Sequence, residues 1–366
     1  MVRMWRRTAA GMLAPAGALA PGGGSVFSLS AHACTDGSAI LAAGTFSRVL
    51  HAWRVAATEG GDARVVETLL TSREHTGWVR ATAVADEHSC CSIGCNRLLA
   101  WRLPGGPPPD LPERELPLYE EATATDQAAQ RSHDILSIGW RNGVLAAGSV
   151  DGALRCWRGD AATEPAAVLT RRPAHWLGHS DRVAAVALAA DGALLSAGYD
   201  GAVRAWCAPD GPELGAGWEL SHEARLPSGR PIALAVGGAR VQPPCGENRL
   251  AGATARRPGL LWLALSAPGC AAHSGRATEP LRAPWQAVVR PKGPAEVAAS
   301  AASNTQVHCS TSDGEVRSLD AASLELATEP MRMTQGTRAT AVAVLGTDTL
   351  VAGDSSGMLH LGHDPC

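Results

Sequence analysis

Histidine and aspartate are the residues of this sequence best suited to acid–base chemistry, and they recur as pairs. His179 precedes Asp200, and His133 precedes Asp151 at a similar distance along the chain. A histidine held by a carboxylate can act as a general base when both side chains converge on a substrate. These pairs, however, recur in successive copies of a repeated segment, whereas catalytic groups gather once at a single point. The repetition favours a structural role, and we predict no catalytic residue and no enzyme activity.

A second group of reactive residue types consists of His88, Cys90, Cys91 and Cys95. Structural zinc sites usually combine two short arms of ligands, such as C-x₂₋₄-C or H-x₃₋₅-H, and this segment provides only one arm. Cys90 and Cys91 are adjacent, so a β-strand would send them to opposite faces of its sheet. We interpret the segment as a strand rich in small residues. No metal, cofactor or small-molecule substrate is predicted.

Charge and composition restrict the partners that the chain can bind. The 366 residues carry a formal net charge of −3, so no broad surface for nucleic acid or anionic membrane is expected. The aromatic and basic residues that interleave at Trp78–Arg80 and at Phe46 with Arg48 are little for an RNA-binding face. No run of about 18 apolar residues occurs, so no membrane-spanning helix is predicted.

The elements that position the His–Asp pairs are short strands joined by tight turns. Residues 178–208, GHSDRVAAVALAADGALLSAGYDGAVRAWCA, hold three apolar runs separated by two Asp-Gly turns. Short apolar runs with glycine-containing turns between them are typical of β-hairpins. Three such strands form an antiparallel meander, and the polar stretch that follows can supply a fourth.

The same plan recurs along the chain. Residues 74–103 and 132–159 repeat the order of histidine, apolar run, glycine and tryptophan. In two copies an aspartate stands six residues before the tryptophan, Asp151 before Trp157 and Asp200 before Trp206. Seven units at a spacing of about 40 to 57 residues indicate a repeat of four-stranded sheets. The four weaker copies are residues 25–55, 230–265, 295–320 and 339–362.

Two connections between the repeats contain proline. RELPLYE, residues 114–120, follows a stretch rich in proline and glycine and is predicted to form an outer strand. PLRAPWQAVVRPKGP, residues 280–294, is interrupted by prolines and is predicted to be irregular.

Residues 178–207 resemble a blade of the WD-repeat β-propeller family. The residues that carry the resemblance are Gly178-His179, Ser196-Ala197-Gly198, Asp200-Gly201 and Trp206, with Cys207 where the family usually has aspartate. The resemblance covers most of the chain from residue 25. It implies an all-β, seven-bladed β-propeller of four-stranded antiparallel blades, and the weaker copies leave six or eight blades open.

The resemblance also implies a hydrogen-bonded set inside each blade. In this set the aspartate accepts from the imidazole, the imidazole meets the serine hydroxyl, and the hydroxyl receives the indole N–H. Such a network stabilises a blade only when every member has its partner. The residues expected to form these sets are His179, Ser196, Asp200, Trp206, His133, Asp151, Trp157, His75 and Trp101.

The function implied by the resemblance is a non-catalytic scaffold that binds protein partners through the propeller faces and loops. In the family, one position after the leading histidine and one before the aspartate face the mouth of the channel. At these positions the chain carries Trp78, Arg182, Tyr199, Phe46 and Val150. Exposed Trp, Tyr and Arg dominate interface energetics, so these residues are the predicted partner-binding site. An RNA-associated propeller subunit and a propeller enzyme with an active site at the channel mouth are the alternatives.

Residues 1–24 precede the first repeat and contain arginine but no acidic residue. They are predicted to be an N-terminal arm, either a closing strand from VRMWRRTAA (2–10) or a targeting segment, and residues 25–366 are predicted to form the propeller. Cysteines at 156, 207 and 309 lie in strand-like apolar runs, which favours a reducing compartment. We expect a cytoplasmic protein, with organelle targeting through residues 1–24 as an alternative and the nucleus also open.

Overall fold

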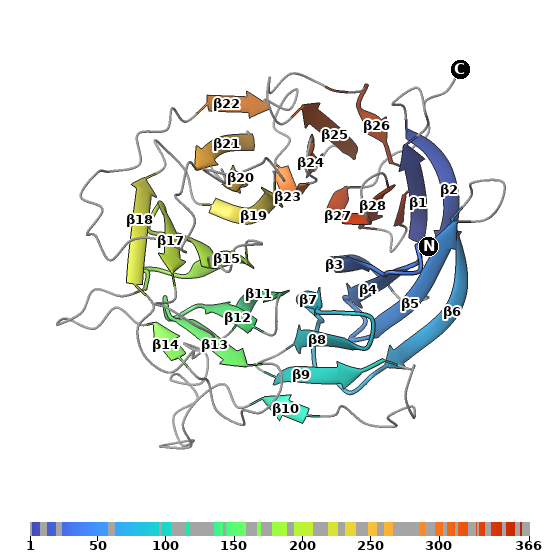
Figure 1. Ribbon diagram of the computed structural model, residues 1–366, viewed down its shortest axis with the longest axis horizontal. Helices are drawn as coiled ribbons and strands as arrows, with labels where there is room; N and C mark the ends of the chain where they lie inside the picture. The colour runs from blue at the N-terminus through green and yellow to red at the C-terminus, as the bar shows by residue number, and fades with distance from the viewer. Residues whose placement is uncertain are drawn as a thin grey trace. The chain divides into compact units, whose positions relative to one another are not determined.

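The protein is all-β in the computed structural model (Figure 1). Every regular element in its described part is a β-strand, and the strands form seven antiparallel sheets of four or five strands each. The described part contains no helix with the length and apolar character needed to cross a membrane. The all-β class predicted from the sequence is therefore confirmed. The described residues are 2–7, 13–19, 24–57, 63–94, 97–103, 114–116, 135–141, 144–158, 167–169, 178–188, 194–207, 219–225, 231–238, 248–254, 260–265, 286–289, 297–302, 306–311, 314–320, 327, 329–333, 338–345, 349–355 and 359–360.

The chain divides into two compact units. Unit 1 comprises Met1–Leu116 and Pro291–Cys366, and unit 2 comprises Pro117–Arg290. We name the sheets by letter and describe each unit by itself.

Three sheets of unit 1 are built from strands that follow one another in the chain. Sheet B contains β3 (Val26–Ala33), β4 (Ala39–Thr45), β5 (Leu50–Ala57) and β6 (Ala63–Ser72). Sheet C contains β7 (Ala81–Val84), β8 (Ser89–Gly94), β9 (Arg97–Arg102) and β10 (Arg114–Leu116). Sheet G contains β23 (Val297–Ala302), β24 (Gln306–Thr311), β25 (Glu315–Asp320) and β26 (Met331–Arg332). The outer strand expected in RELPLYE is β10.

Sheet A, the fourth sheet described in unit 1, combines strands from both ends of the sequence. Its strands are β27 (Ala339–Leu345), β28 (Thr349–Asp354), β1 (Val2–Arg7), β2 (Leu13–Leu19) and β29 (Leu359–His360). β1 pairs antiparallel with β28, with Met4 opposite Val351, and β2 pairs with β1. Residues 2–7 of the segment 2–10, one of whose expected roles was a closing strand, thus pair with the second strand of the last repeat.

The described residues of unit 2 form three sheets of four strands. Sheet D contains β11 (Ile135–Arg141), β12 (Val144–Ser149), β13 (Leu154–Arg158) and β14 (Ala167–Leu169). Sheet E contains β15 (Val183–Leu188), β16 (Leu194–Gly198), β17 (Ala202–Cys207) and β18 (Glu219–Arg225). Sheet F contains β19 (Pro231–Gly238), β20 (Asn248–Thr254), β21 (Leu260–Leu265) and β22 (Gln286–Val289).

Strand β22 corrects one expectation from the sequence. Residues 280–294 were predicted to be irregular, but β22 lies within them and pairs with β21. Its four residues fall between Pro284 and Pro291, so no proline interrupts the paired segment. An outer strand forms hydrogen bonds with a neighbouring strand along one edge only, so a segment of this length is long enough to pair with β21.

The core lies between successive sheets, which explains why second strands such as β4 and β16 consist mainly of apolar and small residues. β4 and β16 are buried along their whole length. In unit 1 the first strands β23, β27, β3 and β7 contact one another in that order, and in unit 2 the same holds for β11, β15 and β19. A strand covered on both faces has no side that favours polar residues, so its sequence is a continuous apolar run rather than an alternating one.

A β-bulge recurs at the start of the first strand. The register of the first two strands shifts by one residue after Val26 in sheet B and after Val183 in sheet E, and equivalent shifts occur in sheets A, D, F and G. A bulge leaves one residue unpaired and turns its side chain in a new direction. This shared irregularity is independent evidence that the sheets are copies of one unit.

Glycine near the end of the second strand allows the next sheet to approach closely. A Cβ built on Gly148 of sheet D would lie 2.5 Å from Cγ1 of Val183 in sheet E. A Cβ on Gly44 of sheet B would lie 2.6 Å from Cγ1 of Val79, which precedes sheet C. Both valines are fully buried. The small residues of the repeat are therefore required by packing between sheets.

The substitution Gly148→Ala tests this packing. The added methyl group overlaps Val183, and we expect a loss of about 1–3 kcal/mol in the free energy of unfolding. The matched control is Gly139→Ala in the same sheet, where the nearest atom to the new Cβ is 3.8 Å away. Thermal and urea unfolding measure both variants. Equal stability of the two variants would contradict the close approach of sheets D and E.

Candidate functional site

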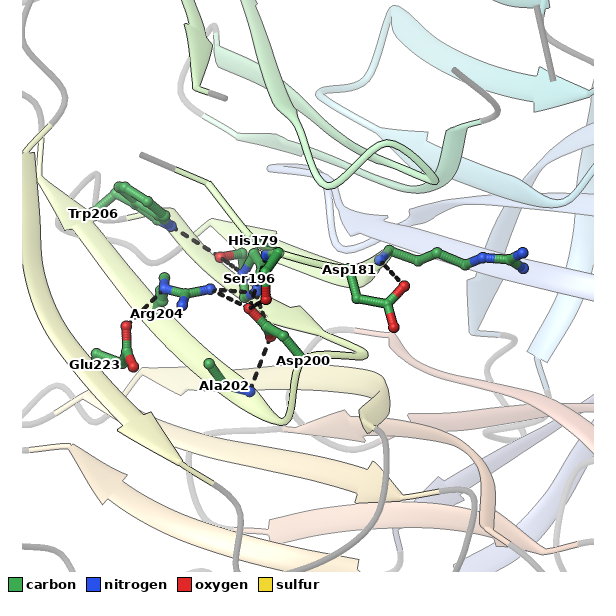
Figure 2. Close-up of polar contacts among 10 residues, drawn as sticks. His179, Asp181, Ser196, Asp200, Ala202, Arg204, Trp206 and Glu223 are labelled. Atoms are coloured by element: carbon green, nitrogen blue, oxygen red, sulfur yellow. Dashed lines mark hydrogen bonds and ion pairs between the residues drawn. The ribbon is translucent and has the colours of Figure 1, made fainter. Parts of the chain in front are cut away.

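A buried chain of hydrogen bonds joins the segment entering sheet E to its second and third strands (Figure 2). The Trp206 indole Nε1–H donates to Ser196 Oγ at 2.9 Å. Ser196 Oγ lies 2.8 Å from His179 Nε2, and His179 Nδ1 lies 2.9 Å from Asp200 Oδ1. Four residues predicted to form one set are thus brought together, on the entering segment, β16, the following turn and β17.

Arginine 204 extends this network and was not anticipated from the sequence. Its Nη1 donates to Asp200 Oδ2 at 2.9 Å, and its Nε donates to Glu223 Oε2 on β18 at 2.9 Å. A sequence signal exists, because an aspartate is followed four residues later by arginine at 151–155, 200–204 and 313–317. Arg204 thereby links the turn to the outer strand of sheet E.

The protons of the network can be assigned from its donors and acceptors. Ser196 Oγ accepts the indole proton, so its own proton is available for His179 Nε2. A neutral imidazole then carries its proton on Nδ1 and donates it to Asp200. Nη1 of Arg204 also lies 2.6 Å from Nδ1, but that nitrogen has no free lone pair in this tautomer, and we assign the Arg204 proton to Asp200 Oδ2.

Ser196, His179 and Asp200 have the contacts of a Ser–His–Asp triad, but the serine is enclosed. In hydrolases such a serine attacks the substrate carbonyl with its hydroxyl oxygen. Here Ser196 is 0% exposed, and its oxygen already accepts the Trp206 indole proton. Trp206 is also 0% exposed. The same three side chains therefore act as an internal brace of the sheet.

Burial and pairing shift the pKa values of this network. Burial lowers the pKa of His179 below its ordinary value of 6.5, and the hydrogen bond to Asp200 only partly opposes this. Burial would raise the pKa of Asp200, but the bonds from His179 and Arg204 outweigh it and hold that pKa well below the usual range. The pair is thus a neutral histidine beside a carboxylate at pH 7.

Sheet C contains a shorter version of the same network. His75 Nε2 lies 2.7 Å from Ser92 Oγ, and Trp101 Nε1 donates to that oxygen at 2.8 Å. His75 and Ser92 are buried, like Trp101. Gly94 follows Ser92 because a Cβ there would lie 2.9 Å from the His75 ring. His75 and Trp101, predicted for this repeat, are therefore joined through Ser92, which was not predicted.

In sheet D the described part of the set centres on Asp151. Arg155 Nη2 and the Ala153 amide both donate to its carboxylate at 2.9 Å, and the Ser149 hydroxyl also donates to it. Burial raises the pKa of Asp151, but the Arg155 contacts outweigh it and lower the pKa to about 2. His133 and the side chain of Trp157 lie outside the described residues.

Three exposed aromatic side chains gather where sheets B and C meet in unit 1. The ring centroids of Phe46 and Trp78 are 4.5 Å apart, and the Phe27 ring is 5.7 Å from each of them. The exposed fractions are 37% for Phe27, 46% for Phe46 and 43% for Trp78. We call these three residues the aromatic cluster. Both phenylalanines of the chain belong to it.

The backbone holds the segments of the aromatic cluster together. The Phe46 amide donates to Ser25 O at 2.8 Å, and the Val79 amide donates to Thr45 O at 3.1 Å. These bonds join the start of β3, the turn after β4 and the segment entering β7. The rings are therefore presented by fixed backbone rather than by a long loop.

The structure brings together two of the five predicted partner residues, Phe46 and Trp78. Phe27 was missed, because it is the residue left unpaired by the bulge between Val26 and Ser28, and alternation along a regular strand does not reveal this. Arg182 and Tyr199 are neighbours in unit 2, where the Tyr199 amide donates to Arg182 O at 2.8 Å. Arg182 is exposed, and Tyr199 is partly buried.

The fifth predicted partner residue, Val150, lies in the turn after β12 in unit 2 and is partly buried. It immediately precedes Asp151, whose carboxylate anchors this turn to β13 through Arg155.

The cysteine segment of sheet C is enclosed in the core. Cys90 and Cys91 of β8 are fully buried, and burial raises the pKa of Cys90 to about 12 and that of Cys91 well above its ordinary value. The described residues contain no group of three or more His, Cys, Asp or Glu that could hold a metal ion. Cys95 lies outside them.

A Gly-x-Ser-x-Gly pattern occurs at residues 353–357, and the nucleophile turn of some hydrolases has the same pattern. In those enzymes the serine lies between a strand and a helix. Here Ser355 follows β28, and the next described element is strand β29. Its hydroxyl oxygen accepts the Arg338 amide proton at 3.1 Å. Ser355 therefore lies in a turn that directly follows a strand, and no helix follows it among the described residues.

No protein-family model matches this chain, and no curated protein matches it at a significant level. The site is accordingly interpreted from its own geometry.

Replacing the Asp200 carboxylate tests the brace. Asp200→Asn removes one of the two carboxylates that contact the buried Arg204 and leaves it with Glu223 alone, and we expect a loss of about 3 kcal/mol in unfolding free energy. The matched variant Asp151→Asn affects a more exposed pair, because 19% of the Asp151 side chain is exposed against 5% for Asp200. For Asp151→Asn we expect a loss of about 1 kcal/mol in unfolding free energy. Urea unfolding of both variants measures this, and a larger loss at Asp151 would contradict the assignment.

The brace also predicts how stability depends on pH. Because the folded-state pKa of His179 lies below 6.5, its contribution is complete above pH 6.5 and is lost as pH falls through the folded-state value. Protonation of Asp200 and Asp151 adds a second loss of folding stability as pH falls below 3.8. His179→Asn should have a lower melting temperature at neutral pH but a weaker decline between neutral pH and pH 5 than the unmodified protein. Parallel declines would rule out His179 as the source.

Proposed function

We propose that the chain is a seven-bladed WD-repeat β-propeller in which each sheet is one blade. Three observations support this proposal: the seven four- and five-stranded sheets, the successive contacts of first strands within each unit, and the repeated bulge. The His–Ser–Trp sets of sheets C and E also support it. Pairing of β1 with β28 supports closure by the N-terminal segment, as propellers require a partner for the last blade.

We further propose that the protein is a non-catalytic scaffold that binds protein partners through the aromatic cluster. The single observation that carries this is the exposure of Phe27, Phe46 and Trp78 in mutual contact. Among the described residues only one other large hydrophobic side chain, Leu220, is exposed to a similar degree. A contiguous patch of exposed apolar surface marks an interaction site, whereas single exposed apolar residues scattered over the surface do not.

The remaining chemistry of the chain is consistent with a scaffold. The Ser196 hydroxyl is enclosed by its own network, and the thiols of Cys90, Cys91 and Cys156 are buried with raised pKa values, so they are poor nucleophiles. The described cysteines, including Cys34 and Cys309, are free thiols. Free thiols support the cytoplasm as the proposed compartment.

Affinity purification with quantitative mass spectrometry tests the scaffold proposal. The double variant Phe46→Ser/Trp78→Ser removes the exposed rings without opening the core, and Leu220→Ser is the matched control. We expect partner recovery to fall by about thirtyfold in the double variant, since an interface tryptophan contributes about 2 kcal/mol or more. Melting temperatures of both variants should stay near that of the unmodified protein. Unchanged recovery with the double variant would refute the role of the cluster.

A further inference from the structure

We propose that the aromatic cluster, together with the arginines around it, binds an acidic segment of a partner protein that carries a large apolar side chain as its anchor. This inference rests on the proposed scaffold function and specifies the chemistry of the partner. In it, the anchor packs on the rings and the carboxylates of the segment meet the arginines.

The arginines concerned are Arg48, Arg80 and Arg338, which we call the arginine rim. All three are exposed. Arg80 places its guanidinium carbon 5.9 Å from the Trp78 ring centroid, and Arg48 lies two residues after Phe46 in the same turn. Each is thus adjacent to the aromatic cluster or to the segments that hold it.

A continuous set of hydrogen bonds connects Arg338 to the aromatic cluster. The Ser355 amide donates to Arg338 O at 2.9 Å, and the Ser25 hydroxyl donates to Ser355 O. Ser25 O in turn accepts the Phe46 amide proton at 2.8 Å. The arginine rim therefore extends along the same ends of sheets A, B and C that carry the rings.

The local charge at these sheet ends is positive although the chain as a whole carries −3. In the described segments 24–28, 45–49, 73–80, 338–340 and 354–355, the exposed charged residues are Arg48, Arg73, Glu74, Arg80 and Arg338. Asp354, the other charged residue in these segments, is fully buried. At these sheet ends four exposed positive charges therefore outnumber one exposed negative charge, and this excess favours an acidic partner.

The opposite ends of sheets B and C carry both acidic residues and arginines. The turn between β3 and β4 carries Asp36, and the turn between β7 and β8 carries Asp86 and Glu87. Glu87 Oε1 accepts hydrogen bonds from the Thr35 amide and hydroxyl at 2.9 and 3.1 Å, so this end is itself ordered. Arg54 lies 3.5 Å from Asp36, and Arg102 is exposed near the turn that follows β7. The positive excess of the cluster end is therefore not repeated here, and an acidic segment is favoured at the cluster end.

Arg48 occupies a backbone conformation that arginine rarely adopts. Its φ is 68°, and the equivalent turn positions in sheets D, E and G are glycines, Gly152, Gly201 and Gly314, all with positive φ. A non-glycine residue in this region costs about 1 kcal/mol or more. A guanidinium next to Phe46 is therefore present in spite of a stability cost, as expected if it contacts a ligand.

Ring geometry disfavours two other classes of ligand. The three ring planes lie within 29° of one another, so they form a stack and not the perpendicular walls of a cage for a methylated cation. Stacking also covers ring faces that nucleobases would need, and the Arg80 guanidinium lies over the face of Trp78. Ring edges and arginines remain open, which suits an apolar anchor flanked by carboxylates.

The inference is tested by selecting, from a displayed library of random peptides, those that bind the 366-residue protein. We expect enriched peptides to contain a Trp, Phe or Leu flanked by Asp and Glu. A synthetic peptide with the enriched sequence should bind about thirtyfold more weakly to Phe46→Ser/Trp78→Ser. It should bind about tenfold more weakly to Arg48→Glu/Arg80→Glu, with a loss of salt dependence. Leu220→Ser and Arg141→Glu, which alter exposed residues of unit 2, should leave binding unchanged.

Arg48→Gly separates stability from binding. Glycine relieves the positive φ, so this variant should unfold at the same temperature or higher, yet it should bind the peptide more weakly because the guanidinium is gone. A variant that is both stable and weakened in binding cannot be explained by misfolding. Undiminished binding by Arg48→Gly would count against the arginine rim.

The possible failures are distinguishable. Peptides that depend on the aromatic cluster but show no acidic preference would overturn this inference and leave the proposed scaffold function standing. Peptides unaffected by Phe46→Ser/Trp78→Ser would overturn both. Binding of oligouridylate that is lost in the same variant would assign the cluster to nucleic acid instead. Self-association in sedimentation, lost in the variant, would assign it to a second copy of the chain.

Discussion

One hydroxyl group holds sheet E of this protein together. Ser196 Oγ receives the Trp206 indole proton and meets His179 Nε2, so three segments of sheet E converge on one atom. Trp206 and Ser196 are 0% exposed, and neither could find water if the contact were lost. An unpaired buried donor costs about 1–3 kcal/mol. The geometry of the entering segment therefore depends on this atom, and Asp200 and Arg204 extend the same constraint to the turn and the outer strand.

Hydrogen bonds of the same kind explain why the ends of the sheets can present apolar side chains. In sheet C the His75–Ser92–Trp101 set fixes the segment that carries Trp78, and backbone bonds fix the turn that carries Phe46. Exposed aromatic rings on a fixed backbone lose little conformational entropy on binding. Rigidity inside the sheet and the recognition that we propose at its end are therefore consistent with one arrangement.

Much of the sheet interior could be predicted from sequence, because His, Ser, Gly and Trp recur at a period set by the strands. Features that break the period were not predictable in this way. Phe27 is turned outward by a bulge that shifts register without changing composition, and β22 pairs although prolines flank it. Arg204 was missed because its partner Glu223 lies on an outer strand that the repeat pattern does not specify.

The pairing of β1 with β28 has a consequence for how the protein is made. A ribosome releases β1 first and β28 only after more than three hundred further residues, so sheet A stays incomplete throughout that interval. In the meantime the edge of β1 has no strand to pair with except β2. Contacts between such distant segments close slowly, and unpaired edges invite aggregation in the interval. A nascent chain of this kind exposes one edge of β1 until β28 emerges.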